Sequence, residues 1–232
     1  MKRIIVIGGT SGYGEGIAKQ LKDEGNDVFV FGSSSKPRLD VTNEKDIVDR
    51  FNEIGNFDVL IYSAGLAIGK DYVSNKNNED FKKVFAVNTL GLLSTLKHSY
   101  EYLKKSEGHF VHIGSIANEL SYVGGADYCA SKSASNTIMK TIRKEWLGTN
   151  IRTSSMEVGL GDTKFQLNRY KGDESKTIKH TSGVRQIQPI DLGKTISFIL
   201  SAPNYLNFDE VVLKPTDQAS HGISINNLKK QF

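Results

Sequence analysis

Three tyrosines in the sequence are each followed by a lysine four residues later, a spacing that places a phenol and an ammonium group on one helix face. The pairs are Tyr72/Lys76, Tyr100/Lys104 and Tyr128/Lys132. Only Tyr128 has a serine thirteen residues upstream, and that serine, Ser115, directly follows a strand-like run at 109–114. Positioned side chains of these types carry general acid–base chemistry, so Ser115, Tyr128 and Lys132 form the leading catalytic candidate.

A glycine-rich segment follows the first strand-like run, residues 2–7, with the spacing GxxxGxG rather than GxGxxG. Glycines let the backbone turn tightly and approach a pyrophosphate, which the N–H groups of the next helix would face. The alternative is a strand-to-helix turn that binds no ligand. As a dinucleotide site the segment would contribute Gly8, Thr10, Ser11, Gly12, Tyr13 and Gly14.

The end of the second strand-like run, residues 27–31, carries no acid. Dinucleotide-binding proteins that use NAD commonly place a carboxylate there to hold the ribose 2′-OH. Here Gly32, Ser33 and Ser34 are followed by Lys36 and Arg38, hydroxyls and cations that suit a 2′-phosphate. The sequence therefore favours NADP(H), with NAD(H) as the open alternative. The alternative interpretation is that Lys36 and Arg38 are solvated loop charges.

Strand-like and helical segments alternate through most of the chain. The strand-like runs are 2–7, 27–31, 57–62, 109–114, 151–158 and 210–213, and the helical patterns are 17–24, 47–54, 78–105, 126–147 and 190–200. Nearly continuous apolar strands are typical of a parallel sheet buried on both faces. We predict one α/β domain over residues 1–232, a Rossmann-like doubly wound parallel sheet with helices on both faces. Its ligand should bind at the carboxyl ends of the strands.

Composition excludes several other classes of protein. The 232 residues are 38% hydrophobic and 24% charged, as in an ordinary globular chain. The aliphatic run near the start is too short to span a membrane. The single cysteine, Cys129, gives no support to an oxidising compartment, so we expect a cytoplasmic protein. The net charge of +4 is not gathered in blocks, which disfavours nucleic-acid binding. No metal site is expected, because the histidines lack ligand spacing: His98, His109, His112, His180 and His221.

Taken together, the motifs resemble the short-chain dehydrogenase/reductase family, in its small single-domain branch, from about residue 2 to residue 218. They are the GxxxGxG turn, Asp40-Val41, Tyr62-Ser63-Ala64-Gly65, Val87-Asn88-Thr89-Leu90-Gly91, Gly114-Ser115, Tyr128-Cys129-Ala130-Ser131-Lys132 and Val158-Gly159-Leu160-Gly161-Asp162-Thr163. The sequence departs from the family at Ile7, often Thr, at Tyr62-Ser63, usually Asn-Asn, and at Val158, usually Pro.

The resemblance implies an NAD(P)(H)-dependent oxidoreductase that interconverts a carbonyl and a secondary alcohol by hydride transfer. Tyr128 would be the general acid in reduction and the base in oxidation, with Lys132⁺ and the nicotinamide charge lowering its pKa. Ser115 would hydrogen-bond the carbonyl oxygen, and Asn88 would position a water in a proton relay. Further implied cofactor contacts are Asp40, Val41, Ser63, Ala64, Gly65, Asn88, Tyr128, Lys132, Val158, Gly159 and Thr163.

A basic segment follows the strand-like run 151–158, at the position of the family's substrate loop, which we place near 163–188. Its cations outnumber its acids: Lys164, Arg169, Lys171, Lys176, Lys179 and Arg185 against Asp173 and Glu174. It is interpreted either as a lid that recognises an anionic small-molecule carbonyl or alcohol substrate, or as a solubilising lid.

Two further expectations concern the whole chain. The resemblance implies a homodimer or homotetramer. The competing function is a non-catalytic NADP-binding sensor or scaffold with the same fold. A sugar-nucleotide epimerase is disfavoured, because 232 residues leave no room for the substrate domain of that branch.

Overall fold

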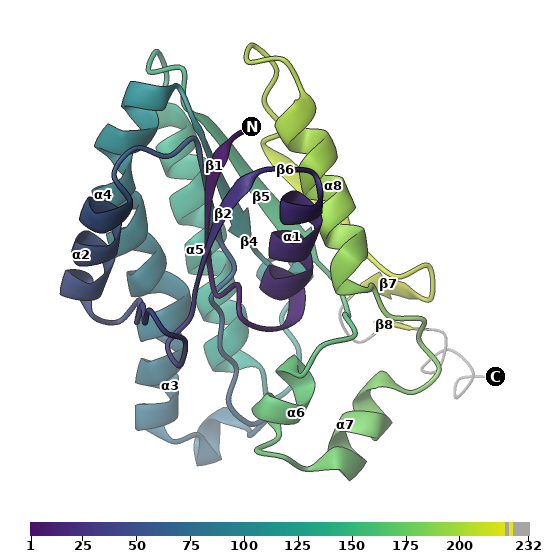
Figure 1. Cartoon of the computed structure of the whole chain (residues 1–232). Coiled ribbons are helices and arrows are strands. Elements are labelled where there is room, and N and C mark those ends of the chain that lie inside the picture. The colour runs from purple at the N-terminus through teal and green to yellow at the C-terminus, as the bar shows by residue number, and fades with distance from the viewer. Residues whose placement is uncertain (221–222, 225–232) are drawn as a thin grey trace.

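The computed structural model describes residues 1–220 and 223–224, and in them a six-stranded parallel sheet forms the centre of the molecule (Figure 1). The strands are β1 (Arg3–Ile7), β2 (Asp27–Phe31), β3 (Val59–Tyr62), β4 (His109–Ile113), β5 (Arg152–Val158) and β6 (Glu210–Leu213). Their order across the sheet is β2-β1-β3-β4-β5-β6, and every neighbouring pair is parallel. The predicted α/β fold is confirmed.

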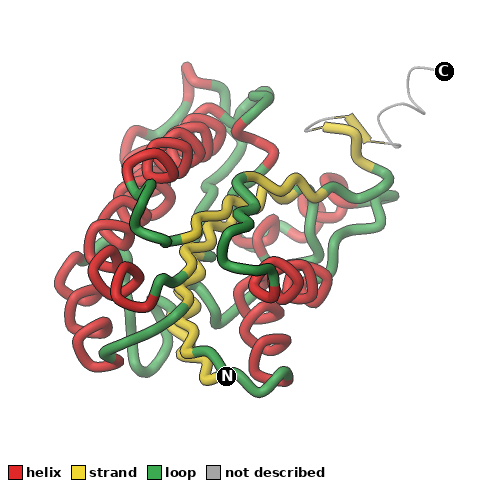
Figure 2. The backbone as a smooth tube through the Cα atoms, turned by 90° about the horizontal axis from the view of Figure 1, so that it is seen from above, coloured by secondary structure: helices red, strands yellow, loops and turns green. Residues whose placement is uncertain are grey.

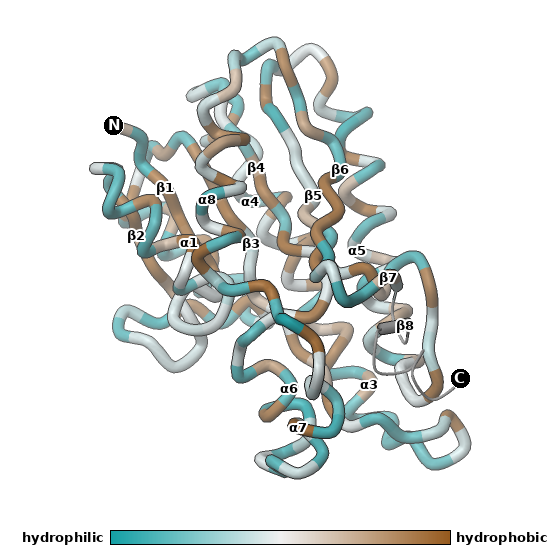
Figure 3. Tube along the Cα trace, turned by 90° about the vertical axis from the view of Figure 1, so that its right-hand side faces the viewer, coloured by the Kyte–Doolittle hydropathy of each residue, from teal (hydrophilic) through white to brown (hydrophobic). Residues whose placement is uncertain are grey.

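Helices cover both faces of the sheet. One face carries α1 (Gly12–Asp23) and α8 (Pro189–Ser201), and the other carries α2 (Glu44–Ile54), α4 (Gly91–Ser106) and α5 (Ala126–Glu145). Seen from above, the strands run as a layer between these two sets of helices (Figure 2). Hydrophobic residues concentrate along the strands (Figure 3). Alternate residues of β1 point to opposite faces, so Ile5 and Ile7 join one core and Ile4 and Val6 the other.

Two helix starts follow from local chemistry. The side chain of Asn43 accepts a hydrogen bond from the Lys45 N–H and caps α2, as its position before the helical pattern predicts. Helix α8 begins with Pro189 and a capping box formed by Gln188 and Asp191. Helix α1 starts at Gly12, five residues before the predicted pattern at 17, because its first turn is rich in glycine and has no hydrophobic periodicity.

Other elements differ from the prediction. The single helix expected over 78–105 is α3 (Asn78–Phe85), a π-helical turn η2 (Ala86–Leu90) and α4, because the hydrophobic pattern alone does not reveal the wider turn. Short polar segments without clear periodicity also form elements that were not predicted. They are η1 (Val73–Asn75), η3 (Ile116–Asn118), α6 (Phe165–Arg169), α7 (Glu174–Thr181), β7 (Gln218–Ser220) and β8 (Ile223–Ser224).

The winding of the chain places a crevice at one edge of the sheet. From β1 the chain passes to β2 on one side and then returns to β3 on the other side of β1. Loops that leave the carboxyl ends of β1 and β3 therefore diverge, and ligands of such sheets bind there. Helices α6 and α7, which follow β5, lie beyond this same edge in Figure 1.

Membrane-spanning helices and metal-ligand clusters are both absent from the described part of the chain. No helix within residues 1–220 is long and apolar enough to cross a membrane. Over the same residues and 223–224, no group of three or more His, Cys, Asp or Glu side chains is placed to hold a metal ion. The histidine at position 221 lies outside the described residues.

Candidate active site

A cleft of about 650 Å³ opens at the carboxyl ends of the strands and brings together nearly all of the predicted site residues. Those in its lining are Gly8, Thr10, Ser11, Gly12, Tyr13, Gly32, Ser33, Ser34, Asp40, Val41, Ser63, Ala64, Gly65, Ser115, Tyr128, Lys132, Val158, Gly159 and Thr163. Gly14 and Asn88, which are buried, are not part of the lining.

The glycine-rich turn is shaped as a dinucleotide cradle. Gly8 and Gly12 have φ angles of +77° and +56°, a region that glycine occupies without strain. A Cβ atom on Gly8 would lie 2.5 Å from the Ala64 nitrogen, and one on Gly14 would overlap the Gly8 carbonyl. Gly12 and Tyr13, the first two residues of α1, line the cleft, and the first N–H groups of a helix have no intrahelical partner. These groups fit a pyrophosphate.

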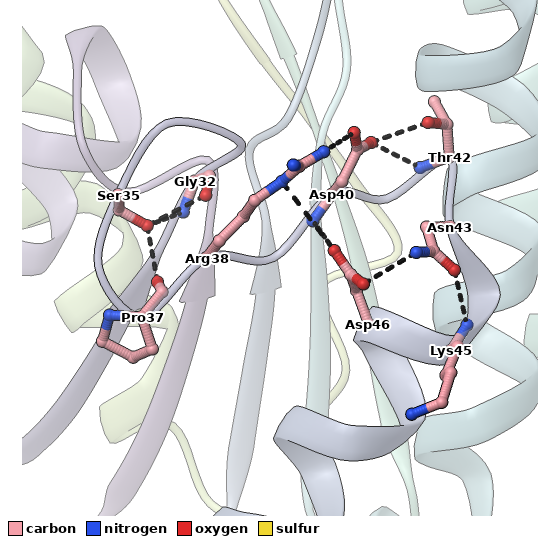
Figure 4. Close-up of polar contacts among 9 residues, drawn as sticks. All are labelled: Gly32, Ser35, Pro37, Arg38, Asp40, Thr42, Asn43, Lys45 and Asp46. Carbon is pink, nitrogen blue, oxygen red and sulfur yellow. Dashed lines mark hydrogen bonds and ion pairs between the residues drawn. The ribbon is translucent and has the colours of Figure 1, made fainter.

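The loop after β2 turns the Arg38 side chain, which the sequence had assigned to a 2′-phosphate together with Ser33 and Ser34, toward Asp40 and Asp46 (Figure 4). Ser33 and Ser34 line the cleft. Arg38 instead forms an ion pair with Asp40 at 2.7 Å and approaches Asp46 at 3.9 Å, and neither it nor Lys36 is in the lining. A hydrogen bond from the Thr42 hydroxyl, more than Arg38, lowers the pKa of Asp40. The sequence alone could not show that Arg38 pairs with Asp40 and Asp46, because the direction of its side chain depends on how the loop folds.

Ser115 and Tyr128 meet at the wall of the cleft. Ser115 follows β4, and its hydroxyl also accepts a hydrogen bond from the Ala117 N–H at the start of η3. Burial raises the pKa of Tyr128, and hydrogen bonding to Ser115 and the charge of Arg169 only partly oppose it. Tyr128 is therefore a neutral phenol, the form that can give up a proton. The predicted lowering of the Tyr128 pKa includes the charge of a bound nicotinamide, so it stays a prediction for the complex with the cofactor.

Lys132 lies one turn along α5 from Tyr128. Its Nζ donates to the Ile113 carbonyl at 3.0 Å and lies 6.0 Å from the centre of the Tyr128 ring. Burial lowers the pKa of Lys132 to about 8, against the effect of Glu157, which raises it. A lysine whose pKa is lowered this far toward neutral pH is common at functional sites and also occurs at buried structural sites.

The other two Tyr–Lys pairs have structural roles. Lys76 forms a buried ion pair with Asp127 at 2.6 Å and donates to the Ile68 carbonyl, so it holds the loop after β3 against α5. Lys104 lies 5.6 Å from the ring centre of Tyr100 on α4. Neither pair lines the cleft, which agrees with the choice of Tyr128 from its upstream serine.

Asn88 ties the loop after β3 to α5. Its Oδ1 accepts from the Leu66 N–H at 2.7 Å, and its Nδ2 donates to the Leu66 carbonyl and to the Ser131 hydroxyl, both at 2.9 Å. The π-helical turn η2 carries Asn88, and such turns often mark functional sites.

Tyr62, which replaces the family's usual asparagine, supports this turn from β3. Its buried hydroxyl donates to the Val87 carbonyl at 2.6 Å, directly before Asn88. We expect Tyr62→Phe to lower the free energy of unfolding by about 1–2 kcal/mol, because the Val87 carbonyl loses a buried partner. Urea unfolding measures this, and an unchanged midpoint would contradict it.

Glu157, at the end of β5, is a buried acid that the sequence analysis missed. It accepts the Ser115 N–H at 2.7 Å and the Ser155 hydroxyl at 2.5 Å, and burial raises its pKa. A Cβ on Gly114 would overlap its carboxylate, so the glycine of Gly114-Ser115 makes room for it.

Removing the charge of Glu157 tests its electrostatic effect on Lys132. Glu157→Gln should lower the pKa of Lys132 further, so the variant should lose activity progressively between pH 6 and pH 9 as Lys132 becomes neutral. Each unit of pKa shift corresponds to about a tenfold difference at the alkaline end. The measurement is kcat/KM for carbonyl reduction relative to the unmodified enzyme. A ratio that stays constant with pH would leave Glu157 only a structural role.

The cleft also contains residues that sequence reasoning either missed or recorded only as charges. At the end formed by α6, α7 and the loop after β3, these are Leu66, Lys70, Phe165, Gln166, Asn168, Arg169, Lys179 and His180. Phe165 packs on Tyr128, with ring centres 5.6 Å apart. The local sequence around these residues has no hydrophobic periodicity or motif that would distinguish side chains lining the cleft from exposed ones.

Comparisons with known proteins give the class of protein that this site belongs to. Residues 2–174 match the short chain dehydrogenase family. An NADP-dependent 3-hydroxy acid dehydrogenase of Schizosaccharomyces pombe is 32% identical, over 88% of this chain and 79% of that protein. Another, from Salmonella typhi, is 27% identical over 96% of this chain and 98% of that protein. A solved serine dehydrogenase, in its closed form with NADP⁺, has a TM-score of 0.90 and 26% identity, covering 96% and 98% of the two chains.

The fold, the dinucleotide cleft and these similarities define an oxidoreductase. The chain belongs to the short-chain dehydrogenase family. The dehydrogenase names of its relatives support the enzyme over the non-catalytic sensor or scaffold, and their NADP dependence supports NADP(H) as the favoured cofactor.

Proposed function

We propose that the protein catalyses the NADP(H)-dependent interconversion of a small 3-hydroxy acid and the corresponding 3-oxo acid. The observation that carries the proposal is the meeting of Ser115, Tyr128 and Lys132 in the cleft that also contains the glycine cradle. The names of the relatives suggest the 3-hydroxy acid.

Each residue has a separate task in this reaction. NADPH, when bound, supplies the hydride that the carbonyl carbon receives. Ser115 donates a hydrogen bond to the carbonyl oxygen, and the Tyr128 hydroxyl gives it the proton, so that a carbonyl, a hydride and a proton yield the alcohol. Lys132 binds the nicotinamide ribose and stabilises the Tyr128 phenolate that remains. Asn88 positions a water that returns the proton.

The cofactor would lie along the whole cleft. The N-terminus of α1 would hold the pyrophosphate, Asp40 and Val41 the adenine, and Thr163 the carboxamide. The hydroxyls of Ser33 and Ser34 would bind the 2′-phosphate, which is supported by their place in the cleft lining and by the pairing of Arg38 with Asp40.

Thermal unfolding with each cofactor tests this assignment. At about 100 times its Kd, NADPH should stabilise the protein by about 2.7 kcal/mol, and NADH at the same concentration should do less. A larger shift with NADH would overturn the preference for NADP(H). No shift with either cofactor would overturn the proposed function.

We also propose that residues 163–188 form a substrate lid and that the substrate is an anion. The support is the excess of cations in this segment and the place of α6 beside Tyr128. The competing interpretation is a lid that only keeps the surface soluble. Turnover of matched anionic and neutral substrates decides, because equal specificity constants would overturn the anionic substrate.

The remaining proposals concern the assembly and its location. We propose a cytoplasmic homodimer or homotetramer that pairs through α4 and α5. Exposed Leu90 and Leu93, at 58% and 49%, are apolar surface that pairing would cover. A monomer in light-scattering measurements would contradict this proposal.

A further inference from the structure

We infer that Arg169 is the specificity-determining residue that binds the carboxylate of the substrate, an assignment that rests on the proposed function. Arg169 ends α6, and its side chain is 1% exposed although it lines the cleft. An arginine is almost never buried to this degree without a partner for its charge.

The described residues supply hydrogen-bond acceptors for only some of the N–H groups of the Arg169 guanidinium. Its Nε donates to the Gly69 carbonyl at 3.0 Å, while Nη2 is buried without a hydrogen-bond partner among the described residues. The Tyr122 and Tyr128 rings lie 5.2 and 5.7 Å from Cζ. The Tyr122 hydroxyl also interacts with the guanidinium, and the two aromatic faces stabilise its charge, but neither ring face accepts the N–H groups in the plane of the fork.

No acid within residues 1–220 pairs with Arg169, unlike several other cations of the same segment. Lys171 approaches Asp80 at 3.8 Å, Lys176 pairs with Asp173 at 3.1 Å, and Arg185 with Asp217 at 2.9 Å, all three cations being largely exposed. The basic composition noted in the sequence is therefore mostly surface charge. Among the described arginines that are buried with an unused donor, Arg169 lines the cleft and Arg152 does not. A carboxylate is the group that matches a guanidinium fork.

The position of Arg169 fits the spacing of the substrate. The carbonyl to be reduced meets Ser115 and the Tyr128 hydroxyl, and the guanidinium lies over the ring of that same tyrosine. In a 3-oxo acid one methylene separates the carbonyl from the carboxylate, so both groups can be held around a single aromatic side chain.

Neighbouring groups keep this end of the cleft positive. Lys70 lies 5.0 Å from the Tyr122 ring centre, and the charge of Arg169 adds to burial in lowering the pKa of Lys70. Burial, Lys70 and Arg169 lower the pKa of His180 to about 4, so His180 is neutral at physiological pH. Arg169 therefore supplies the buried positive charge, and Lys70 adds a more exposed one.

The test compares 3-hydroxybutanoate with its neutral amide, both oxidised with NADP⁺. Arg169→Gln should lower kcat/KM for the acid by about 10–100-fold, mainly through KM, and change that for the amide by less than about threefold. Arg169→Lys should restore part of the loss for the acid, because it returns a point charge without the fork. The matched control is Arg185→Gln, which removes an exposed, acid-paired arginine of the same segment and should leave the ratio of kcat/KM for the acid to that for the amide unchanged.

A binding measurement separates this inference from the proposed function. With NADPH bound, 3-hydroxybutanoate cannot be oxidised, yet it should raise the thermal midpoint of the unmodified protein, and the amide should not. Arg169→Gln should abolish that shift. If that variant does not fold, Arg169→Lys, which keeps a point charge without the fork, should reduce the shift without abolishing it.

Each alternative outcome has one meaning. Equal losses for acid and amide, or no loss for either, would overturn the role of Arg169 and leave the hydride transfer standing. Stabilisation by the acid that depends on Arg169, without turnover of either compound, would overturn the proposed function and keep the carboxylate site.

Discussion

Tyr128→Phe is expected to lower kcat for carbonyl reduction by about 10²–10⁴-fold, because the general acid is removed while the ring stays in place. The ring packs against Ala67, Ala117 and Cys129, and none of these contacts needs the hydroxyl. Affinity for NADPH should therefore remain within about threefold, since most of the cradle lies on other elements. Single-turnover kinetics and a fluorescence titration with NADPH measure the two quantities.

The chain contains a matched control for this variant. Tyr100 has the same spacing to its lysine, lies on α4 and packs against Trp146 away from the cleft. Tyr100→Phe should leave turnover unchanged. If Tyr128→Phe retained more than about a tenth of the activity, another group would have to supply the proton.

Lys132→Met is expected to abolish most turnover and at the same time to stabilise the protein without cofactor. A pKa lowered from 10.5 to about 8 means that burying the ammonium costs about 3 kcal/mol at neutral pH. Loss of the hydrogen bond to the Ile113 carbonyl offsets about 1 kcal/mol of the gain. The net increase in the free energy of unfolding should be about 2 kcal/mol at pH 7.

The pH dependence of this gain has a definite sign. Between pH 8 and pH 10.5 the unfolded chain holds a proton on Lys132 that the folded chain has released, so the folded protein becomes more stable as pH rises. The advantage of Lys132→Met is therefore largest below pH 8 and shrinks above it. Urea unfolding at pH 7 and pH 9.5 measures this. If the difference in the free energy of unfolding between Lys132→Met and the unmodified protein does not change with pH, burial does not lower the pKa of Lys132.

The catalytic candidates could be found from sequence because their relations are local. Four residues along a helix put Tyr128 and Lys132 on one face whatever the tertiary structure. Ser115 was identified because a strand ends just before it, and parallel strands all present their carboxyl ends at one edge. Glycines spaced for a tight turn are also a local signal, and the cradle forms where they predict it.

Features that depend on long-range contacts could not be predicted in this way. Glu157 meets Ser115 only because β5 pairs with β4, and Asn88 reaches Leu66 only through the wider turn of η2. The loop after β2 turned Arg38 toward Asp40, so the cation that suggested a 2′-phosphate lies outside the cleft wall.

The sequence by itself determined the class of fold, the glycine-rich turn and the choice of candidate proton-transfer residues, because helix periodicity, strand patterning and glycine spacing act over a few residues. The tertiary structure alone decided the pKa values of Tyr128 and Lys132 and the distinction between Arg169 and the other cations of its segment. Burial has the largest effect on the two pKa values, and the absence of a paired acid within the described residues distinguishes the buried Arg169. Both depend on which distant segments pack together, and no local pattern encodes that.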